Sequence, residues 1–154
     1  MAAALKESCA HLEENAAKVS AMRDRLIEGL SKIPYSRCNG DPGCRAPGIV
    51  SFCFEGIEGE SLLLRLDLAG ICASSGSACT SGSLDPSHVL LALGLPHEIA
   101  HGSLRLSLSE YNTLEEVDYI LQQVPEVVRM LRQMSPVWSH MLEKTEDPYL
   151  AMAK

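Results

Sequence analysis

Leucine alternates strictly with polar residues in the segment SLRLSLS at residues 103–109, and this alternation constrains the fold more than any other feature. Successive side chains on a strand point to opposite faces of the sheet, so the pattern predicts a strand with one apolar and one polar face. Leu104, Leu106 and Leu108 are expected to be buried, with Arg105 among serines on the opposite face. The leucine face then needs a layer of helices to cover it.

Segments with helical and strand periods alternate along the rest of the chain. Their spacing and turn residues predict a helix over residues 5–30, a strand over 48–54, a short helix over 59–68 and a second short strand over 70–73. They further predict a helix opening at Asp85 and Pro86 and closing at Gly94, one or two helical turns over 96–101, and a short helix after Ser135.

Thr113 and Glu116 have the spacing of a capping box, and the apolar stripe that follows predicts another helix, which Pro125 should kink or interrupt. The order of elements predicts an α+β fold, with a small antiparallel or mixed sheet flanked by helices. The length of 154 residues fits a single domain over residues 1–154.

Composition and charge exclude several classes of function. The net charge of −7 comes with no basic patch or stripe, so we expect no nucleic-acid partner. No apolar stretch approaches the roughly 20 residues that span a bilayer, and the N-terminus lacks the basic head and apolar core of a signal peptide. We therefore expect a cytoplasmic protein without a membrane partner. Its six cysteines should be reduced, and the absence of a C-x-x-C pair argues against a structural zinc knuckle.

Cys79 lies in the segment SSGSACTSGS at residues 74–83, which is expected to be a polar, mobile loop. A cysteine acts as a nucleophile only as the thiolate, which requires exposure and a positive local field. The start of the helix expected at Pro86 could supply that field. The residues alone leave open a solvated loop that happens to contain a cysteine. An anion-binding loop is weaker still, because the G-x-x-x-x-G-K spacing is missing.

The other cysteines are expected to be less reactive. Cys53 and Cys72 have apolar neighbours and are expected to be buried. Cys38 and Cys44 lie on a Pro/Gly-rich loop without a partner pattern. Arg105, on the polar face of its strand, can bind a carboxylate with two parallel hydrogen bonds, although a solvent-facing arginine would have the same pattern.

His97, Glu98 and His101 match the H-E-x-x-H pattern of zinc hydrolases, in which both histidines bind the metal. Pro96 and Gly102 bracket the motif, so the helix would be barely longer than the motif itself. A third ligand is not evident from the spacing. A small zinc hydrolase is therefore the weakest of the alternatives, and no metal ligand is assigned.

Two longer stretches carry a resemblance to a known family. SSGSACTSGSLDPSHVLLALGL and AHGSLRLSLSEYNTLEEVDYIL closely resemble the C-terminal region of cysteine desulfurases of the NifS/IscS kind, which are class-V aminotransferase-like. FEGIEGESLLLRLD and MSPVW resemble the same region, so the resemblance runs from the first helix to Trp138. It implies the fold of the C-terminal small domain of fold-type I enzymes that use pyridoxal 5'-phosphate.

The resemblance also implies an activity. Enzymes of this family convert L-cysteine to L-alanine and hold the sulfur as a persulfide, which here would form on Cys79. The mobile loop would carry it to an acceptor, commonly an iron–sulfur scaffold protein. Arg105 matches the family's arginine that binds the substrate carboxylate. His97, Glu98 and His101 fall in a segment that has no metal role in the family.

The chain departs from the family in its cofactor residues. Pyridoxal phosphate is held in the family by a lysine of a preceding large domain, and none of the five lysines here lies in a Ser-x-His-Lys context. We therefore expect no cofactor-binding residue in this chain, which would be a fragment or the product of a split gene. Alone it is expected to be inactive, and the complete enzyme to be a homodimer. A stand-alone sulfur carrier remains the alternative.

Overall fold

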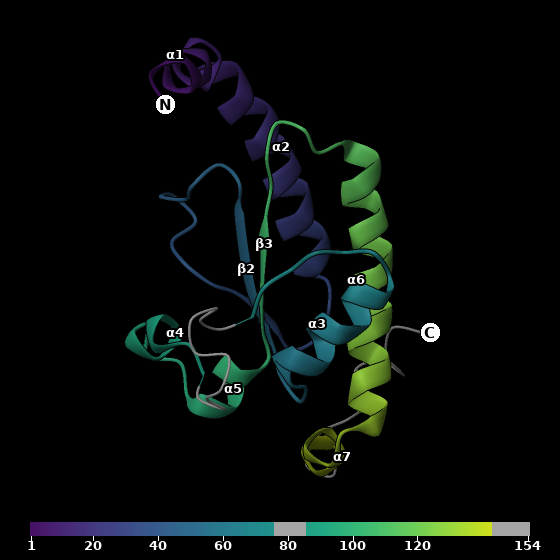
Figure 1. The fold of residues 1–154 in the computed structure, drawn as a ribbon. Coiled ribbons are helices and arrows are strands. Elements are labelled where there is room, and N and C mark those ends of the chain that lie inside the picture. Colours follow the sequence, from purple (N-terminus) through teal and green to yellow (C-terminus); the bar gives the residue numbers. More distant parts are fainter. Residues whose placement is uncertain (76–85, 143–154) are drawn as a thin grey trace.

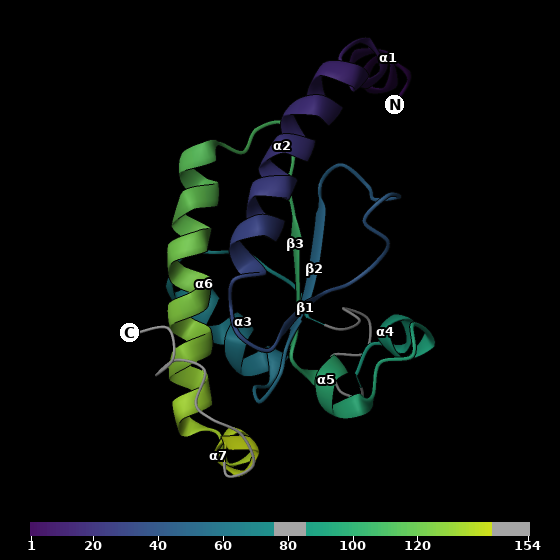
Figure 2. The ribbon, with the colours of Figure 1, turned by 180° about the vertical axis from the view of Figure 1, so that it is seen from behind.

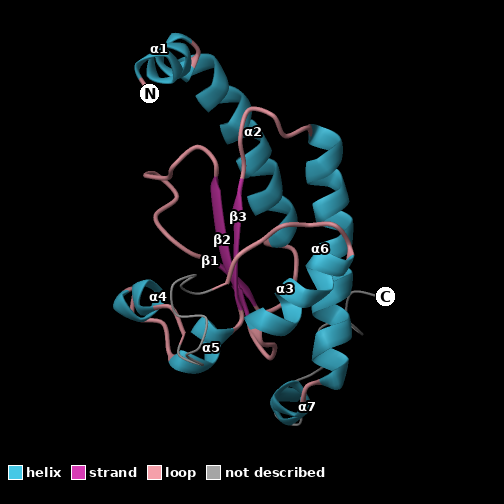
Figure 3. Ribbon diagram, in the orientation of Figure 1, coloured by secondary structure: helices cyan, strands magenta, loops and turns pink. Residues whose placement is uncertain are grey.

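The computed structural model describes residues 1–75 and 86–142. Its elements are α1 (Ala2–Ala10), α2 (Leu12–Leu30), β1 (Ser36–Cys38), β2 (Ile49–Phe54), α3 (Gly59–Leu68), α4 (His88–Ala92), α5 (His97–His101), β3 (Ser103–Ser107), α6 (Leu114–Met134) and α7 (Pro136–Leu142). The strands pair antiparallel in the order β1-β2-β3, and all three are labelled in Figure 3. The expected α+β architecture is confirmed.

One face of the sheet is covered by helices. Helices α2, α3 and α6 lie on one side of the strands, whereas α4 and α5 lie on the other, in both Figure 1 and the view from behind in Figure 2. The core between the sheet and the larger helices is built from alternate residues of β2 and β3, and each large apolar side chain buried there contributes about 1.5–3 kcal/mol. These strand residues are Val50, Phe52, Phe54, Leu104 and Leu106.

Helix α6 begins at the capping box expected from the sequence. The backbone N–H of Glu116 donates to Thr113 Oγ1 at 3.3 Å, and the backbone N–H of Thr113 donates to Glu116 Oε2 at 3.1 Å. The helix then continues through Pro125, so of the expected kink or interruption there, the interruption is wrong. Proline removes one helical hydrogen bond, but Val124 and Val127 on either side of it are buried in the core. The free energy gained by burying these two valines outweighs the cost of the missing hydrogen bond.

The long N-terminal helix expected from the apolar spacing is divided at His11, which has φ −115° and ψ 14°. Val19, Met22, Leu26 and Leu30 of α2 are buried, but α1 buries no residue. Helical spacing of apolar residues therefore overestimated how far the packed helix extends. None of the described helices is both long and apolar enough to cross a bilayer.

Three expected elements differ in extent from those in the structure. Residues 70–73 form no strand, and pairing with β3 is limited to an isolated bridge at Ser74. Helix α4 begins at His88 after Ser87, later than the helix expected from Asp85 and Pro86. Strand β3 ends at Ser107, two residues before the alternating pattern ends. The backbone N–H of Leu108 still donates to Gly48 O at 2.8 Å, so pairing continues one residue beyond the assigned strand.

Arg132 ties the end of α6 to the turns beside β1 and β2. Its side chain, 1% exposed, donates to the backbone oxygens of Pro34 at 2.7 Å, Tyr35 at 3.2 Å and Glu55 at 2.9 Å. Its guanidinium also lies 4.3 Å from the ring centroid of Trp138 in α7. A buried cation is tolerated only when it is well hydrogen-bonded, and these contacts meet that requirement.

Arg132→Met should destabilise the fold by about 2–4 kcal/mol, because the partly buried carbonyls of Pro34 and Glu55 would lose their side-chain donor. Arg129→Met is the matched control, since Arg129 lies one turn earlier on α6 and pairs at the surface with Glu126. Urea unfolding followed by circular dichroism measures both. Equal midpoints for the two variants would show that Arg132 does not anchor α6.

Candidate functional site

Arg105 lies on the polar face of β3, as the alternation predicted. Its side chain is exposed, whereas Leu104 and Leu106 on either side of it are 1% and 3% exposed beneath the helices. The antiparallel register places Ser51 of β2 directly opposite Arg105. Among the described residues, no hydrogen bond or ion pair is made by the Arg105 side chain. The guanidinium is therefore available to an anion.

The segment that leads to Cys79 leaves the sheet beside Arg105. Ser74 N–H donates to Arg105 O at 3.0 Å, and Arg105 N–H donates to Ser74 O at 2.6 Å. Ser75 Oγ lies 3.3 Å from Ser103 Oγ, again on β3. Gly59 leaves room for this contact, because a Cβ there would collide with Ser75 Oγ. Cys79 itself lies outside the described residues, so only the start of its segment is placed.

Cys53 is buried, as expected. Burial raises the pKa of its thiol above the ordinary value of 9.0, against the opposing effects of the Asn39 hydrogen bond and the charge of Arg37. Asn39 Nδ2 donates to Cys53 Sγ at 3.4 Å. A neutral, enclosed thiol of this kind is a poor nucleophile.

Cys72, which was expected to be buried, is exposed. The expectation depended on a strand over residues 70–73. That strand is not formed, so among the described residues no paired strand covers the Cys72 side chain. Cys44 is exposed, and Cys38 is half-buried with Arg45 Nη1 at 2.9 Å from its sulfur. Sequence reasoning missed this contact, which depends on how residues 39–48 turn back toward β1.

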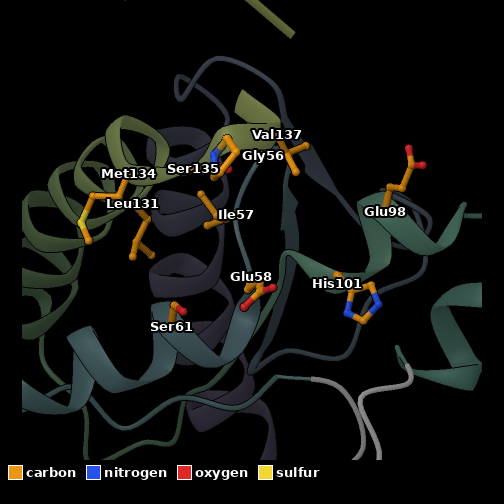
Figure 4. A pocket seen from close by; sticks show the side chains of 11 residues that line it. Gly56, Ile57, Glu58, Ser61, Glu98, His101, Leu131, Met134, Ser135 and Val137 are labelled. Carbon is orange, nitrogen blue, oxygen red and sulfur yellow. The ribbon is translucent and has the colours of Figure 1, made fainter. Parts of the chain in front are cut away.

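The H-E-x-x-H motif forms α5 and contributes to a pocket of about 530 Å³. Glu98 and His101 line the pocket together with Glu58 and the apolar residues where α6 meets α7, as Figure 4 shows, whereas His97 does not line it. In the part of the chain that the structure describes, no three His, Cys, Asp or Glu side chains are grouped to hold a metal ion. The pocket is also separate from Arg105, which is not among its lining residues.

The described lysines do not fit a pyridoxal phosphate site. Lys18 on α2 donates to the backbone oxygen of Glu110, and Lys32 just after α2 pairs with Glu28 at 3.2 Å. Lys6 lies on α1, which buries no residue. Helix α2 packs on the face of the sheet opposite Arg105, so Lys18 cannot approach a substrate bound there. Among the residues that the structure describes, no lysine is therefore placed to hold this cofactor.

The cysteines should differ widely in their rates of alkylation. At pH 8, Cys9, Cys44 and Cys72 should react much faster than Cys53, because exposure admits the reagent while burial keeps the Cys53 thiol neutral. Raising the pH through the folded-state pKa of Cys53 should also remove its stabilising contribution, which is complete below 9.0. Mass spectrometry of the modified peptides measures the rates. Labelling of Cys53 as fast as Cys44 would contradict this arrangement.

Comparison with known proteins places the chain in a family. A family model described as Aminotransferase class-V matches residues 1–120. The chain is 50% identical over 147 residues to cysteine desulfurase IscS of Clostridium botulinum, covering 94% of this chain and 37% of that protein. It is 59% identical over 128 residues to cysteine desulfurase IscS of Methanosarcina thermophila, covering 83% of this chain and 32% of that protein.

A solved structure described as a NifS-like protein shares the fold. It matches with a TM-score of 0.73 at 32% identity, over 84% of this chain and 32% of that chain. The chain thus spans only about a third of the length of the relatives that it matches. Because the family model covers well over half of its residues, the chain belongs to the class-V aminotransferases, and its relatives within that family are cysteine desulfurases of the IscS and NifS kind.

Proposed function

We propose that this chain is the small domain of a cysteine desulfurase, in which Cys79 takes the sulfur of L-cysteine as a persulfide and Arg105 binds the substrate carboxylate. One observation carries the proposal beyond the similarity to relatives. The paired hydrogen bonds between Ser74 and Arg105 start the Cys79 segment on the strand that presents the arginine. The segment that contains the proposed nucleophile thus begins beside the proposed substrate anchor.

Arg105 suits an amino-acid carboxylate. Its guanidinium is exposed and makes no hydrogen bond or ion pair with the described residues, so binding an anion breaks no existing contact. The planar fork of an arginine matches the two oxygens of a carboxylate, and such charge-assisted pairs fix orientation as well as affinity. Orientation is what directs the substrate sulfur toward a thiol.

Cys79 is close in the sequence to Ser74 and Ser75, which contact the strand that bears Arg105. It follows Ser75 by four residues, and a chain of that length spans at most about 15 Å. In the proposed transfer the C–S bond of L-cysteine breaks and an S–S bond forms on Cys79. L-Cysteine and the protein thiol become L-alanine and the protein persulfide. Atoms and electrons balance without an external oxidant, because the substrate carbon is reduced from C–S to C–H as the sulfur is oxidised to the persulfide. A second thiol or a scaffold protein for iron–sulfur clusters then accepts the outer sulfur.

The remaining parts of the enzyme belong to the same proposal. Since the described lysines do not fit pyridoxal 5'-phosphate, we propose that its binding lysine belongs to a large domain outside this chain. The complete enzyme is proposed to be a cytoplasmic homodimer. The lack of a fitting lysine also favours a second candidate, a sulfur carrier that accepts a persulfide made elsewhere.

A composite protein separates the two candidates. The N-terminal part of the Clostridium botulinum relative joined to this chain should produce L-alanine from L-cysteine with pyridoxal phosphate, whereas this chain alone should produce none. Cys79→Ser should abolish the turnover, because no thiol of the segment remains to take the sulfur. Cys44→Ser, at an exposed cysteine distant in the sequence, is the control and should retain it.

Arg105→Lys in the composite should lower kcat/KM for L-cysteine at least about tenfold, because an ammonium cannot make the paired bonds of a guanidinium. Arg37→Lys is the matched control, since Arg37 is an exposed arginine that faces the same side of the sheet from β1. Steady-state alanine formation measures both. An active composite unaffected by Cys79→Ser would refute the proposed nucleophile, and equal losses in the two lysine variants would refute the role of Arg105.

A further inference from the structure

Four polar residues form one row across the sheet at Arg105. Ser51 of β2 is directly opposite Arg105, and Ser74 forms its bridge on the other side of β3. On the far side of β2, the N–H of Asn39 donates to the backbone oxygen of Ser51 at 2.8 Å and extends the β1 register by one residue. Side chains of directly opposed residues point to the same face. Asn39 and Ser51 therefore lie on the polar face with Arg105.

The hydrogen-bond pattern brings the side chains of Ser51 and Arg105 close together. Both backbone groups of Arg105 are used by Ser74. In an antiparallel sheet, the two polar groups of one residue point toward the same neighbouring strand, so Ser51 and Arg105 form a non-hydrogen-bonded pair. The hydrogen bond from Phe54 N–H to Gly102 O agrees with this assignment. It lies three residues further along β2, and the two kinds of pair alternate along an antiparallel ladder. Side chains of such pairs are the closest in a sheet, with Cβ atoms about 4.5–5.5 Å apart.

The Ser51 hydroxyl has a hydrogen left to donate. Asn39 Nδ2 donates to Ser51 Oγ at 3.1 Å, so the hydroxyl acts as the acceptor in that bond. Its neighbour Arg105 has only donors and cannot receive the hydrogen. No other described residue forms a side-chain hydrogen bond with Ser51. A hydroxyl donor and a guanidinium thus lie side by side without an acceptor.

The side-chain amide of Asn39 is held on one side only. Its side chain is only 9% exposed, and its Oδ1 atom is buried without a hydrogen-bond partner in the described structure. An unsatisfied buried acceptor destabilises a fold. The amide is nevertheless held by bonds from Nδ2 to Ser51 Oγ and Cys53 Sγ. The bond from Asn39 Nδ2 occupies one side of Ser51 Oγ, so the hydroxyl hydrogen of Ser51 points in another direction.

We propose that Ser51 donates a hydrogen bond to the substrate carboxylate held by Arg105 and that Asn39 acts as a positioning residue for the Ser51 hydroxyl. This inference rests on the proposed function and adds a specificity element to it. Two different donors on adjacent strands match the two oxygens of a carboxylate. Selection for substrates that bear this group then depends on Ser51 as well as on Arg105.

The test compares inhibition of the composite enzyme by L-alanine and by L-alaninamide, which lacks the charged carboxylate. Ser51→Ala should raise the inhibition constant for L-alanine about tenfold and leave that for L-alaninamide unchanged. Ser51→Thr keeps the hydroxyl and should restore the wild-type value for L-alanine. Asn39→Asp offers only acceptors, so it would capture the Ser51 hydrogen and should reproduce the Ser51→Ala effect. Ser107→Ala, an exposed serine of the same strand face, is the control.

If Ser51→Ala changes the inhibition constants for L-alanine and L-alaninamide equally, or changes neither, the inference is overturned. The proposed function is judged separately, by whether the wild-type composite is active. If the composite produces no alanine, the proposed function fails, and a titration of this chain with propionate decides the inference. Propionate should shift the Nε–H resonance of Arg105 in NMR spectra, with about tenfold weaker binding in Ser51→Ala. The same affinity in both proteins, or no binding to the wild type, would overturn it.

Discussion

The pair of backbone hydrogen bonds between Ser74 and Arg105 is the contact on which the arrangement of the proposed site depends. It joins the segment that contains Cys79 to the edge of a sheet whose other strands are already paired. Because it is made by backbone groups, it fixes the position of the segment's start whatever the side chains do. It also shows that the backbone groups of Arg105 point away from β2, so that Ser51 and Arg105 form a non-hydrogen-bonded pair with close side chains.

The sheet divides structural from chemical roles by its two faces. The leucine and phenylalanine side chains of β2 and β3 anchor α2, α3 and α6, and Arg132 locks the end of α6 to the turns beside the strands. The opposite face carries arginine, serine and asparagine, and α4 and α5 pack only against the end of it near Cys53. A polar face that need not form the core is free to bind a charged substrate.

Local pattern predicted the elements that are stabilised locally. The alternation around Leu104 and the box at Thr113 and Glu116 each specify their own structure within a few residues, and both are confirmed. Residues 70–73 and Cys72 were misassigned because a strand exists only if a partner lies beside it. The row from Asn39 to Ser51 and Arg105 joins residues far apart in sequence, so only the register reveals it.

The central claim is that sulfur from the substrate reaches Cys79, and a single turnover of the composite enzyme with isotopically labelled L-cysteine tests it most directly. Mass spectrometry of the peptide that contains Cys79 should show the added mass of one labelled sulfur atom, removable by a reducing thiol. Labelled sulfur on Cys72 or Cys44, with Cys79 unmodified, would contradict the account. So would release of labelled sulfide with no modified cysteine at any time point.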